Sequence, residues 1–437
     1  MSFPRYQKYK ASGVEWLGEV PEHWDVKRIG YYFKERREKV SDKDFPALSV
    51  TKNGIVPQLD TAAKSDDGDN RKKVCQGDFV INSRSDRKGS SGASELDGSV
   101  SLICTVMRPQ EQVHTPFVHH LLRSQPFQEE FYRNGKGIVA DLWSTNYSEM
   151  RNILLGMPPL PEQTRIAVFL DQELGKIDEL VAEQRRLMEL LKEKRQSVIT
   201  HAVTKGLNPH AAMKSSGIEW LGDVPTHWEV TRIKRLSSLI SKGTTPMTVG
   251  ADFTKDGIRF LKAENITEAG VVEQPEFFIS KEAHDTLSRS SLADGDVLVV
   301  IAGATTGKAC VLSKEILPAN TNQAVSFVRP KDKTHSAYIN SWIGTSLVRN
   351  FIFLNSVQSA QPNLSMEDLG NIPLLLPPPD ELEEIKNFIA VETAKFDTLT
   401  AEAQRASDLL HERRAALISA AVTGQIDVRP LLKKEAA

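Results

Sequence analysis

The chain repeats part of its own sequence, and this repetition constrains its fold more than any other feature. Residues 12–29 read SGVEWLGEVPEHWDVKRI and residues 216–233 read SGIEWLGDVPTHWEVTRI, an offset of 204 positions. A longer, less similar pair covers residues 158–207 and 377–426, with an offset of 219 positions beyond the prolines. Because internal repeats reflect repeated structural units, we expect two related halves about a pseudo-twofold axis.

Two divergent blocks lie between the repeated segments, roughly at residues 30–155 and 235–372. Gly77–Asp78 matches Gly295–Asp296 and Asn152–Ile153 matches Asn371–Ile372, but little else is shared. Divergent inserts in a constant frame indicate two different specificities. Short apolar stretches between Gly, Asn and Asp turns predict mixed α/β structure, with strands at 78–81, 100–106, 297–301 and 325–328 and helices beginning at 117–122 and 338–343.

The longer repeats each predict one long helix. Mostly apolar residues alternate at intervals of three and four, as in a coiled-coil seam, at positions 177, 180, 184, 187, 191 and 198 and at 396, 399, 403, 406, 410 and 417. Pro161 and Pro379 suit the start of each helix, and Gly206 and Gly424 suit its end. About 40 helical residues span roughly 60 Å, so an antiparallel pair would form a rigid spacer. Two ordinary amphipathic helices in a bundle would give the same pattern.

The predicted fold class is therefore α+β, with two mixed α/β domains joined by two long antiparallel coiled-coil helices. A chain of 437 residues is too long for one ordinary core. The predicted parts are a first domain, a central helical spacer, a second domain and a final helical spacer with a tail, at residues 1–157, 158–207, 208–375 and 376–437.

Several classes of protein are excluded by composition. The longest apolar run, at 297–302, is too short to cross a membrane, and the N-terminus has no apolar region of a secretory signal. Three widely spaced cysteines, Cys75, Cys104 and Cys310, argue against a disulfide framework or a zinc site and fit a reducing cytoplasm.

Some segments imitate catalytic motifs. Gly303–Ala309 resembles a phosphate-binding loop, but it has one residue too few between its glycines and an Ala where Ser or Thr would hold magnesium. Asp380, Glu384 and Lys386 imitate a nuclease metal site, yet they open a helix, where acids are expected to stabilise the N-terminus.

The histidines do not indicate a metal site or a catalytic site either. His119–His120 has no Glu or Cys at ligand spacing, which makes a metal site improbable. His23 and His227 lie beside tryptophans in the short repeats and are expected to be packed structural residues.

Net charge is −2, whereas a chain that binds DNA unaided is usually basic. A nucleic-acid surface would therefore be local or completed by other subunits.

Polar and basic side chains that reach phosphates and base edges cluster at matched points of the two blocks. The candidate DNA contacts are Arg71, Lys72, Lys73, Asn82, Ser83, Arg84, Arg87, Lys88 and Lys136 in the first block and Thr305, Thr306, Lys308, Asn322, Gln323, Gln358 and Gln361 in the second. Each could equally be a residue of a solvated loop.

The motif SG[VI]EWLG[ED]VPxHW, written twice, resembles the specificity (HsdS) subunit of type I restriction–modification systems, as do Leu160–Gln163 and the helix ending in Ala-Val-Thr. The resemblance covers essentially the whole chain. It implies that the two blocks are target recognition domains, each reading one half of a split DNA site. The second copy departs from the motif, with Pro379-Asp380-Glu381 in place of Pro-Glu-Gln.

The resemblance also implies partners. The helices would dock two methyltransferase subunits, and restriction subunits would join the complex for cleavage in a prokaryotic cytoplasm. S-adenosylmethionine, ATP and magnesium would bind to those partners. This chain would bind no cofactor and no metal. The candidate docking residues are Ile166, Phe169, Leu170, Leu174, Ile177, Leu180, Leu187, Leu191, Ile385, Phe388, Ile389, Phe396, Leu399 and Leu410. Without partner helices, the seams 166–174 and 385–389 would be exposed and the chain would tend to aggregate.

Two alternatives remain open at this point. A self-sufficient coiled-coil DNA-binding regulator would show the same repeats without an enzyme partner. A nuclease would use Asp380, Glu384 and Lys386.

Overall fold

The computed structural model describes residues 3–60, 68–137, 143–356 and 363–431. The chain forms two compact units: unit 1 comprises residues 1–185 and 404–437, and unit 2 comprises residues 186–403. Helix α5 spans Leu160–Lys205 and helix α11 spans Pro379–Val422. Each unit therefore takes the first half of one long helix and the last half of the other.

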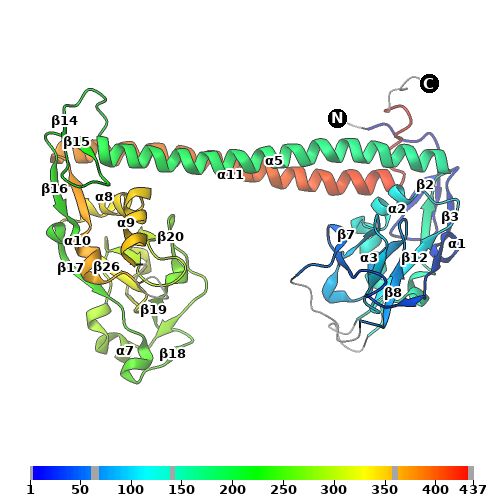
Figure 1. Cartoon of the computed structure of the whole chain (residues 1–437), viewed down its shortest axis with the longest axis horizontal. Coiled ribbons are helices and arrows are strands. Elements are labelled where there is room, and N and C mark those ends of the chain that lie inside the picture. The colour runs from blue at the N-terminus through cyan, green and yellow to red at the C-terminus, as the bar shows by residue number, and fades with distance from the viewer. Residues whose placement is uncertain (1–2, 61–67, 138–142, 357–362, 432–437) are drawn as a thin grey trace. The chain divides into compact units, whose positions relative to one another are not determined.

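Unit 1 is built around an antiparallel sheet. Its strands lie in the order β10 (Ser91–Ala93), β9 (Phe79–Asn82), β12 (Cys104–Pro109) and β4 (Phe33–Glu35). A second sheet contains β11 (Gly98–Val100), β8 (Arg71–Val74) and β5 (Lys39–Val40). Helices α2 (Thr115–Leu121) and α3 (Gln125–Arg133) lie beside the strands of unit 1 (Figure 1). They contribute Phe117, Phe127 and Phe131 to the same buried core as Phe79.

Unit 2 repeats this plan and adds to it. Its main sheet has the order β17 (Ser237–Lys242), β26 (Val325–Pro330), β23 (Val297–Val300) and β24 (Ala309–Val311), and α8 (Ser336–Ile343) packs against β23 and β24. The added sheet contains β18 (Phe253–Thr254), β22 (Phe278–Ile279), β19 (Ile258–Leu261) and β25 (Ala319–Thr321). The pairing of β19 with β25 is parallel.

The short repeats form the same frame in both units. β3 (Asp25–Arg28) pairs with β13 (Leu154–Met157), and β16 (Glu229–Arg232) pairs with β27 (Pro373–Leu376). β1 (Tyr9–Ala11) pairs with β2 (Glu19–Pro21), as β14 (Met213–Ser215) does with β15 (Asp223–Pro225). The remaining elements that bear on the site are α4 (Tyr147–Met150), α9 (Ser346–Ser356), α10 (Met366–Asn371), β6 (Leu48–Thr51), β7 (Gly54–Pro57), β20 (Ile266–Thr267) and β21 (Gly270–Val271).

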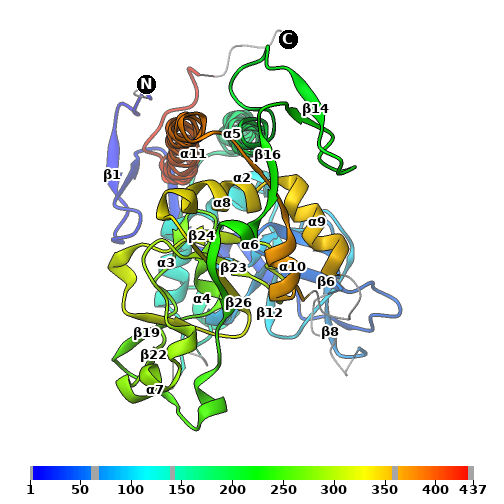
Figure 2. The ribbon, with the colours of Figure 1, turned by 90° about the vertical axis from the view of Figure 1, so that its left-hand side faces the viewer.

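Within each unit the two long helices pack side by side and antiparallel. In unit 1, Asp178 of α5 forms an ion pair with Arg414 of α11, and in unit 2 Arg195 of α5 pairs with Asp397 of α11. The end of α5 at Gly206 lies close to Glu381, at the start of α11. Figure 2 looks toward unit 2 and shows the two helices next to each other above α8. The predicted fold class is confirmed by this architecture.

The predicted phase of the seam is wrong in part. Leu180, Leu187 and Leu399 are 50%, 43% and 46% exposed. The inward positions are instead Val181 and Ser407, which are buried, together with half-buried residues such as Met188 and Thr400. The spacing of three and four residues was correct, but apolar character alone selected leucines that point outward.

The predicted exposure of the apolar stretches 166–174 and 385–389 is also wrong. Seven candidate docking residues are 7% exposed or less because they belong to the cores of their own units: Ile166, Phe169, Leu170, Leu174, Ile177, Ile385 and Ile389. They are thus unavailable to a partner. Of the other candidates, Phe388 is 37% exposed, and Leu191, Phe396 and Leu410 are half-buried.

One predicted strand is divided in the structure, whereas the predicted helix ends are confirmed. The predicted strand 100–106 is two strands, because a turn at residues 101–103 separates β11 from β12. Gly206 and Gly424 end the long helices with φ of +77° and +79°, as expected of glycine at a helix C-terminus. Among the described residues, no helix is long and apolar enough to span a membrane.

Candidate nucleic-acid interface

A glutamate carboxylate, buried in unit 1 and half-buried in unit 2, holds the frame of each unit to the start of a long helix. Glu162 accepts hydrogen bonds from the Trp24 Nε1 (3.0 Å) and the Tyr6 hydroxyl (2.6 Å), and its other oxygen lies 2.7 Å from His23 Nε2. Burial, followed by this carboxylate, raises the pKa of Tyr6. His23 is thus bonded to the frame through Glu162, although its side chain is 39% exposed.

The second unit repeats this arrangement with Glu381. Trp228 Nε1 donates to its carboxylate at 3.0 Å, and His227 Nε2 lies 2.7 Å from it. No sequence pattern indicated that Glu162 and Glu381 bind the tryptophan and histidine of the short repeats. The unmatched Asp380 does not disturb the frame, because Glu381 occupies the position of Glu162.

The frame presents one hairpin loop at the same place in each unit. In unit 1, residues 83–90 connect β9 to β10; in unit 2, residues 301–308 connect β23 to β24. Each loop is held by the segment before a short helix. Thr145 N donates to Ser83 O at 2.9 Å, and Leu364 N donates to Ile301 O at 2.8 Å.

In unit 1 the exposed part of this loop carries Arg84, Arg87 and Lys88. The backbone N–H of Gly89 donates to the Tyr132 hydroxyl, and Lys88 Nζ lies 5.4 Å from the Tyr132 ring centroid. Aromatic packing from α3 thus fixes the loop while its cationic side chains stay accessible. The predicted contacts Arg84, Arg87 and Lys88 lie together on this loop.

Other predicted contacts of the first block have internal partners. Arg71 is 6% exposed, and its guanidinium donates to Ser99 Oγ and Ser99 O. Lys72 Nζ donates to Cys104 O. Asn82 and Ser83 are buried, Lys73 pairs with Glu38 at 2.9 Å, and Lys136 pairs with Glu149 at 3.4 Å. The burial and contacts of Arg71, Asn82 and Ser83 argue against a role in reading bases.

The equivalent loop of unit 2 is different in chemistry. Thr305, Thr306 and Lys308 are half-buried, and Thr306 Oγ1 donates to Gly303 O at 2.7 Å. The loop joins two strands rather than a strand and a helix, so it lacks the architecture of a phosphate-binding loop. Asn322 accepts from Ala324 N, and Gln323 accepts from Thr245. Gln358 and Gln361 lie outside the described residues.

A cavity borders the hairpin loop of unit 1. It has a volume of about 430 Å³ and lies between the loop, α2 and the last part of α11. Its lining includes the cations Lys52, Lys88, Arg123 and Arg414, with His119 and His120 beside them. Lys52, Arg123 and Arg414 were not predicted from the sequence, because they come from three segments that only the fold brings together.

The electrostatics of this cavity are dominated by burial and positive charge. Burial, then Arg123 and the other nearby cationic groups, lowers the pKa of His119 to about 3. Burial also lowers the pKa of His120, against the effect of Asp171 at 2.9 Å. Burial and the proximity of Arg414 lower the pKa of Arg123. Both histidines therefore stay neutral at pH 7 while the arginines stay charged.

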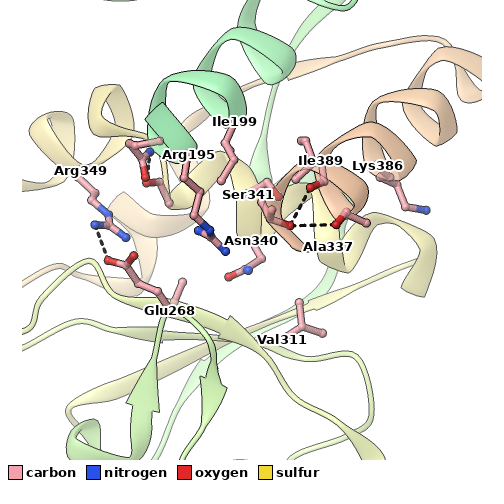
Figure 3. A pocket seen from close by; sticks show the side chains of 15 residues that line it. Arg195, Ile199, Glu268, Val311, Ala337, Asn340, Ser341, Arg349, Lys386 and Ile389 are labelled. Carbon is pink, nitrogen blue, oxygen red and sulfur yellow. Dashed lines mark hydrogen bonds and ion pairs between the residues drawn. The ribbon is translucent and has the colours of Figure 1, made fainter. Parts of the chain in front are cut away.

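Unit 2 has a corresponding cavity of about 210 Å³ (Figure 3). Arg195 and Ile199 line it from α5, at the positions that match Arg414 and Ile418 of unit 1. Here α8 contributes Asn340 and Ser341 to the lining, whereas α2 contributes two histidines in unit 1. Glu268, in the β20–β21 turn, forms a 2.8 Å ion pair with Arg349 across this cavity.

The structure does not support the nuclease alternative or a metal site. Asp380 and Glu384 are exposed on the first turns of α11, and Lys386 Nζ pairs with Glu383 at 2.7 Å. Among the described residues, no group of His, Cys, Asp and Glu side chains is arranged to hold a metal ion. Cys75, Cys104 and Cys310 are free thiols.

The sequence is similar to a DNA specificity domain and to specificity subunits of type I restriction enzymes. The family model of the type I restriction modification DNA specificity domain matches residues 225–405, most of unit 2. The EcoBI specificity subunit of the type I restriction enzyme of Escherichia coli is 23% identical over 354 residues, 80% of this chain and 73% of that protein. The EcoKI specificity subunit of Escherichia coli (strain K12) is 23% identical over 365 residues, 81% and 76% of the two chains.

Solved structures show the same fold. A chain from a study of complex assembly and conformational transition of the type I R-M system superposes with a TM-score of 0.68 at 17% identity, covering 92% of this chain and 98% of that chain. The HsdS subunit from Thermoanaerobacter tengcongensis gives a TM-score of 0.51 at 18% identity, covering 93% and 98%.

Proposed function

We propose that this chain, which belongs to the type I restriction–modification DNA specificity family, selects the DNA sequence on which a larger modification or restriction complex acts. Each unit reads one half of a split site. The observation that carries this proposal is the pair of hairpin loops at residues 83–90 and 301–308, which share one frame but differ in chemistry. Arginine and lysine favour guanine edges and phosphates, whereas threonine contacts several bases.

This chain supplies sequence choice and no covalent step. S-adenosylmethionine, ATP and magnesium are bound by partner subunits in this proposal, and the complex works on DNA in a prokaryotic cytoplasm. Partners that close around the duplex would also supply phosphate contacts, which agrees with a net charge of only −2 for the whole chain.

Outward-facing leucines on the long helices are the proposed docking positions for two methyltransferase subunits, with restriction subunits joining them. Leu180 and Leu399 occupy matching positions and are 50% and 46% exposed. Leu190 and Leu409 also match and are 52% and 55% exposed. Single exposed leucines are ordinary, but the twofold recurrence offers the same surface once in each unit, as two copies of one partner require.

The test is base-resolution methylation mapping in cells that carry this chain with its methyltransferase partner. Replacing Arg84, Arg87 and Lys88 by serine should change one half of the methylated motif and leave the other half unchanged. The matched control replaces Thr305, Thr306 and Lys308 and should change only the other half.

If either set of substitutions changed both halves of the methylated motif, the proposal that each unit reads one half would be contradicted. A chain that binds a split site but copurifies with no methyltransferase would be a self-sufficient regulator instead.

A further inference from the structure

The cavity of unit 1 holds more positive charge than the described structure neutralises. Within the described part of the chain, Lys52, Lys88 and Arg123 have no carboxylate within ion-pair distance. Arg414 is the exception, since Asp178 lies 3.2 Å from its Nε. Like charges at a half-buried site repel one another and are costly unless an anion joins them.

His119 also faces more hydrogen-bond donors than it has acceptors. The backbone N–H of Ala93 points at His119 Nδ1 at 3.2 Å, and Arg123 Nη1 lies 2.6 Å from His119 Nε2. A neutral imidazole has one lone pair for hydrogen bonding, because its other nitrogen carries the proton. One of these two donors is therefore left without an acceptor on the histidine, and Arg123 also donates from Nη2 to Lys52 O at the edge of the cavity.

The corresponding cavity of unit 2 is neutralised from within. Arg349 pairs with Glu268 at 2.8 Å, Arg195 pairs with Asp397 at 3.3 Å, and Lys386 pairs with Glu383 at 2.7 Å. Figure 3 shows Glu268 directed from the β20–β21 turn toward Arg349. Among the described residues that line the unit 1 cavity, none is acidic. The two cavities thus share position and framework but differ in electrostatic character.

We propose that the unit 1 cavity, between Lys52, Lys88, Arg123 and Arg414, binds a phosphodiester group of the DNA backbone, and that the unit 2 cavity does not. The cavity exceeds the roughly 30 Å³ that one water occupies in the liquid, so a phosphate group with bound water fits. This inference rests on the proposed function, because it takes DNA as the source of the phosphate.

The position of the unit 1 cavity explains why a backbone phosphate is preferred over a free anion. Lys88 and Gly89 belong both to the cavity wall and to the exposed hairpin loop. A phosphate held here would fix the register of the loop on the duplex, since backbone contacts position a protein and base contacts specify the sequence. Unit 1 would then anchor the duplex electrostatically, and unit 2 would contribute less to the salt dependence of binding.

The first experiment measures binding of inorganic phosphate to the full chain by calorimetry, at constant ionic strength with chloride as the reference anion. The wild type should bind phosphate saturably. K52Q and R123Q should each weaken it about tenfold or more, the size of one charge-assisted hydrogen bond. The matched control R195Q, in the unit 2 cavity, should bind phosphate like the wild type. An equal loss in R195Q, or no wild-type binding beyond chloride, would overturn the proposal.

The second experiment measures duplex binding by the same proteins as a function of salt. K52Q and R123Q should lower the slope of log K against log salt by about 0.9 for each lost phosphate contact, with the preferred DNA sequence unchanged. Phosphate binding that is lost without any change in this slope would show a free-anion site and would overturn the DNA assignment.

Lys52 is the informative position if R123Q fails to fold, because the Lys52 side chain is exposed, so K52Q should leave the fold intact. A wild-type chain that prefers no DNA sequence, even with its partners, would count against the proposed function. A wild-type salt slope in K52Q, with sequence preference intact, would count against the cavity alone.

Discussion

Arg414 Nε lies 3.2 Å from Asp178 Oδ1, although the two residues are 236 positions apart in the chain. The matching pair, Arg195 and Asp397, lies 3.3 Å apart in unit 2. Each pair joins α5 to α11 inside one unit, so the same residue types make the same contact with the roles of the two helices exchanged. The twofold repeat of the sequence is therefore expressed in the packing of the helices as well as in the strands.

Replacement of Glu162 is expected to destabilise the protein more than replacement of Glu381. E162A leaves the buried donors of Tyr6 and Trp24 without their acceptor, and each buried unsatisfied group costs about 1–3 kcal/mol, whereas His23 is 39% exposed and can bond to water. Glu381 serves two donors, and its side chain is 22% exposed, against 9% for Glu162. Urea unfolding with peptide-resolved labelling of Cys104 in unit 1 and Cys310 in unit 2 measures each effect. Equal losses in the two variants would contradict this ranking.

Unit 1 is expected to lose stability as the pH falls below about 6.5. Burial and neighbouring cations lower the pKa of His119 to about 3 in the folded chain, from its ordinary value of 6.5. Between these values the unfolded chain binds the extra proton, so the stabilisation present above pH 6.5 is lost progressively toward pH 3. Burial also lowers the pKa values of His114 and His120, which act in the same direction although Asp171 opposes both shifts.

The measurement compares urea transitions at pH 7.5 and pH 5 for the wild type and H119Q. The wild type should lose on the order of 1–2 kcal/mol more than H119Q over this interval. H210Q, at an exposed position, is the control and should follow the wild type. An identical pH dependence in H119Q and the wild type would refute the assignment.

The end of α11 should matter to unit 1 rather than to unit 2. Leu417 is 5% exposed and belongs to the core that contains Trp24 and Ile177. L417A should therefore cost about 2–5 kcal/mol and make Cys104 label earlier in urea, with little change at Cys310. L409A, at a site that is 55% exposed, should cost less than about 0.5 kcal/mol. Earlier labelling of Cys310 in L417A would show that the helix end belongs to the other unit.

The outward leucines should govern assembly without governing folding. L180D and L399D place a charge on surfaces that are about half exposed, so the unfolding transition should move little. Each should reduce copurification of the methyltransferase partner, and the double variant should abolish it, because a buried unpaired carboxylate opposes docking. E183Q, at an exposed position on the same helix, is the control. Wild-type copurification by the double variant would place the docking surface elsewhere.

The sequence by itself determined the repeated frame, the two long helices and their glycine ends. These features depend on local signals: an apolar period of three and four, a proline before each helix and a glycine after it. The two tryptophan-containing repeats aligned the halves, and the matched Gly-Asp turns at residues 77–78 and 295–296 located one strand in each block.

Only the tertiary structure decided which face of each helix turns inward and which polar side chains meet. A leucine at position 180 and a valine at position 181 are equally apolar, so the neighbour across the seam chooses between them. The cavity of unit 1 joins Lys52, Lys88, Arg123 and Arg414 from separate segments, and no local pattern records that proximity. Local periodicity specifies elements, whereas electrostatic sites depend on distances that are fixed only when the elements pack.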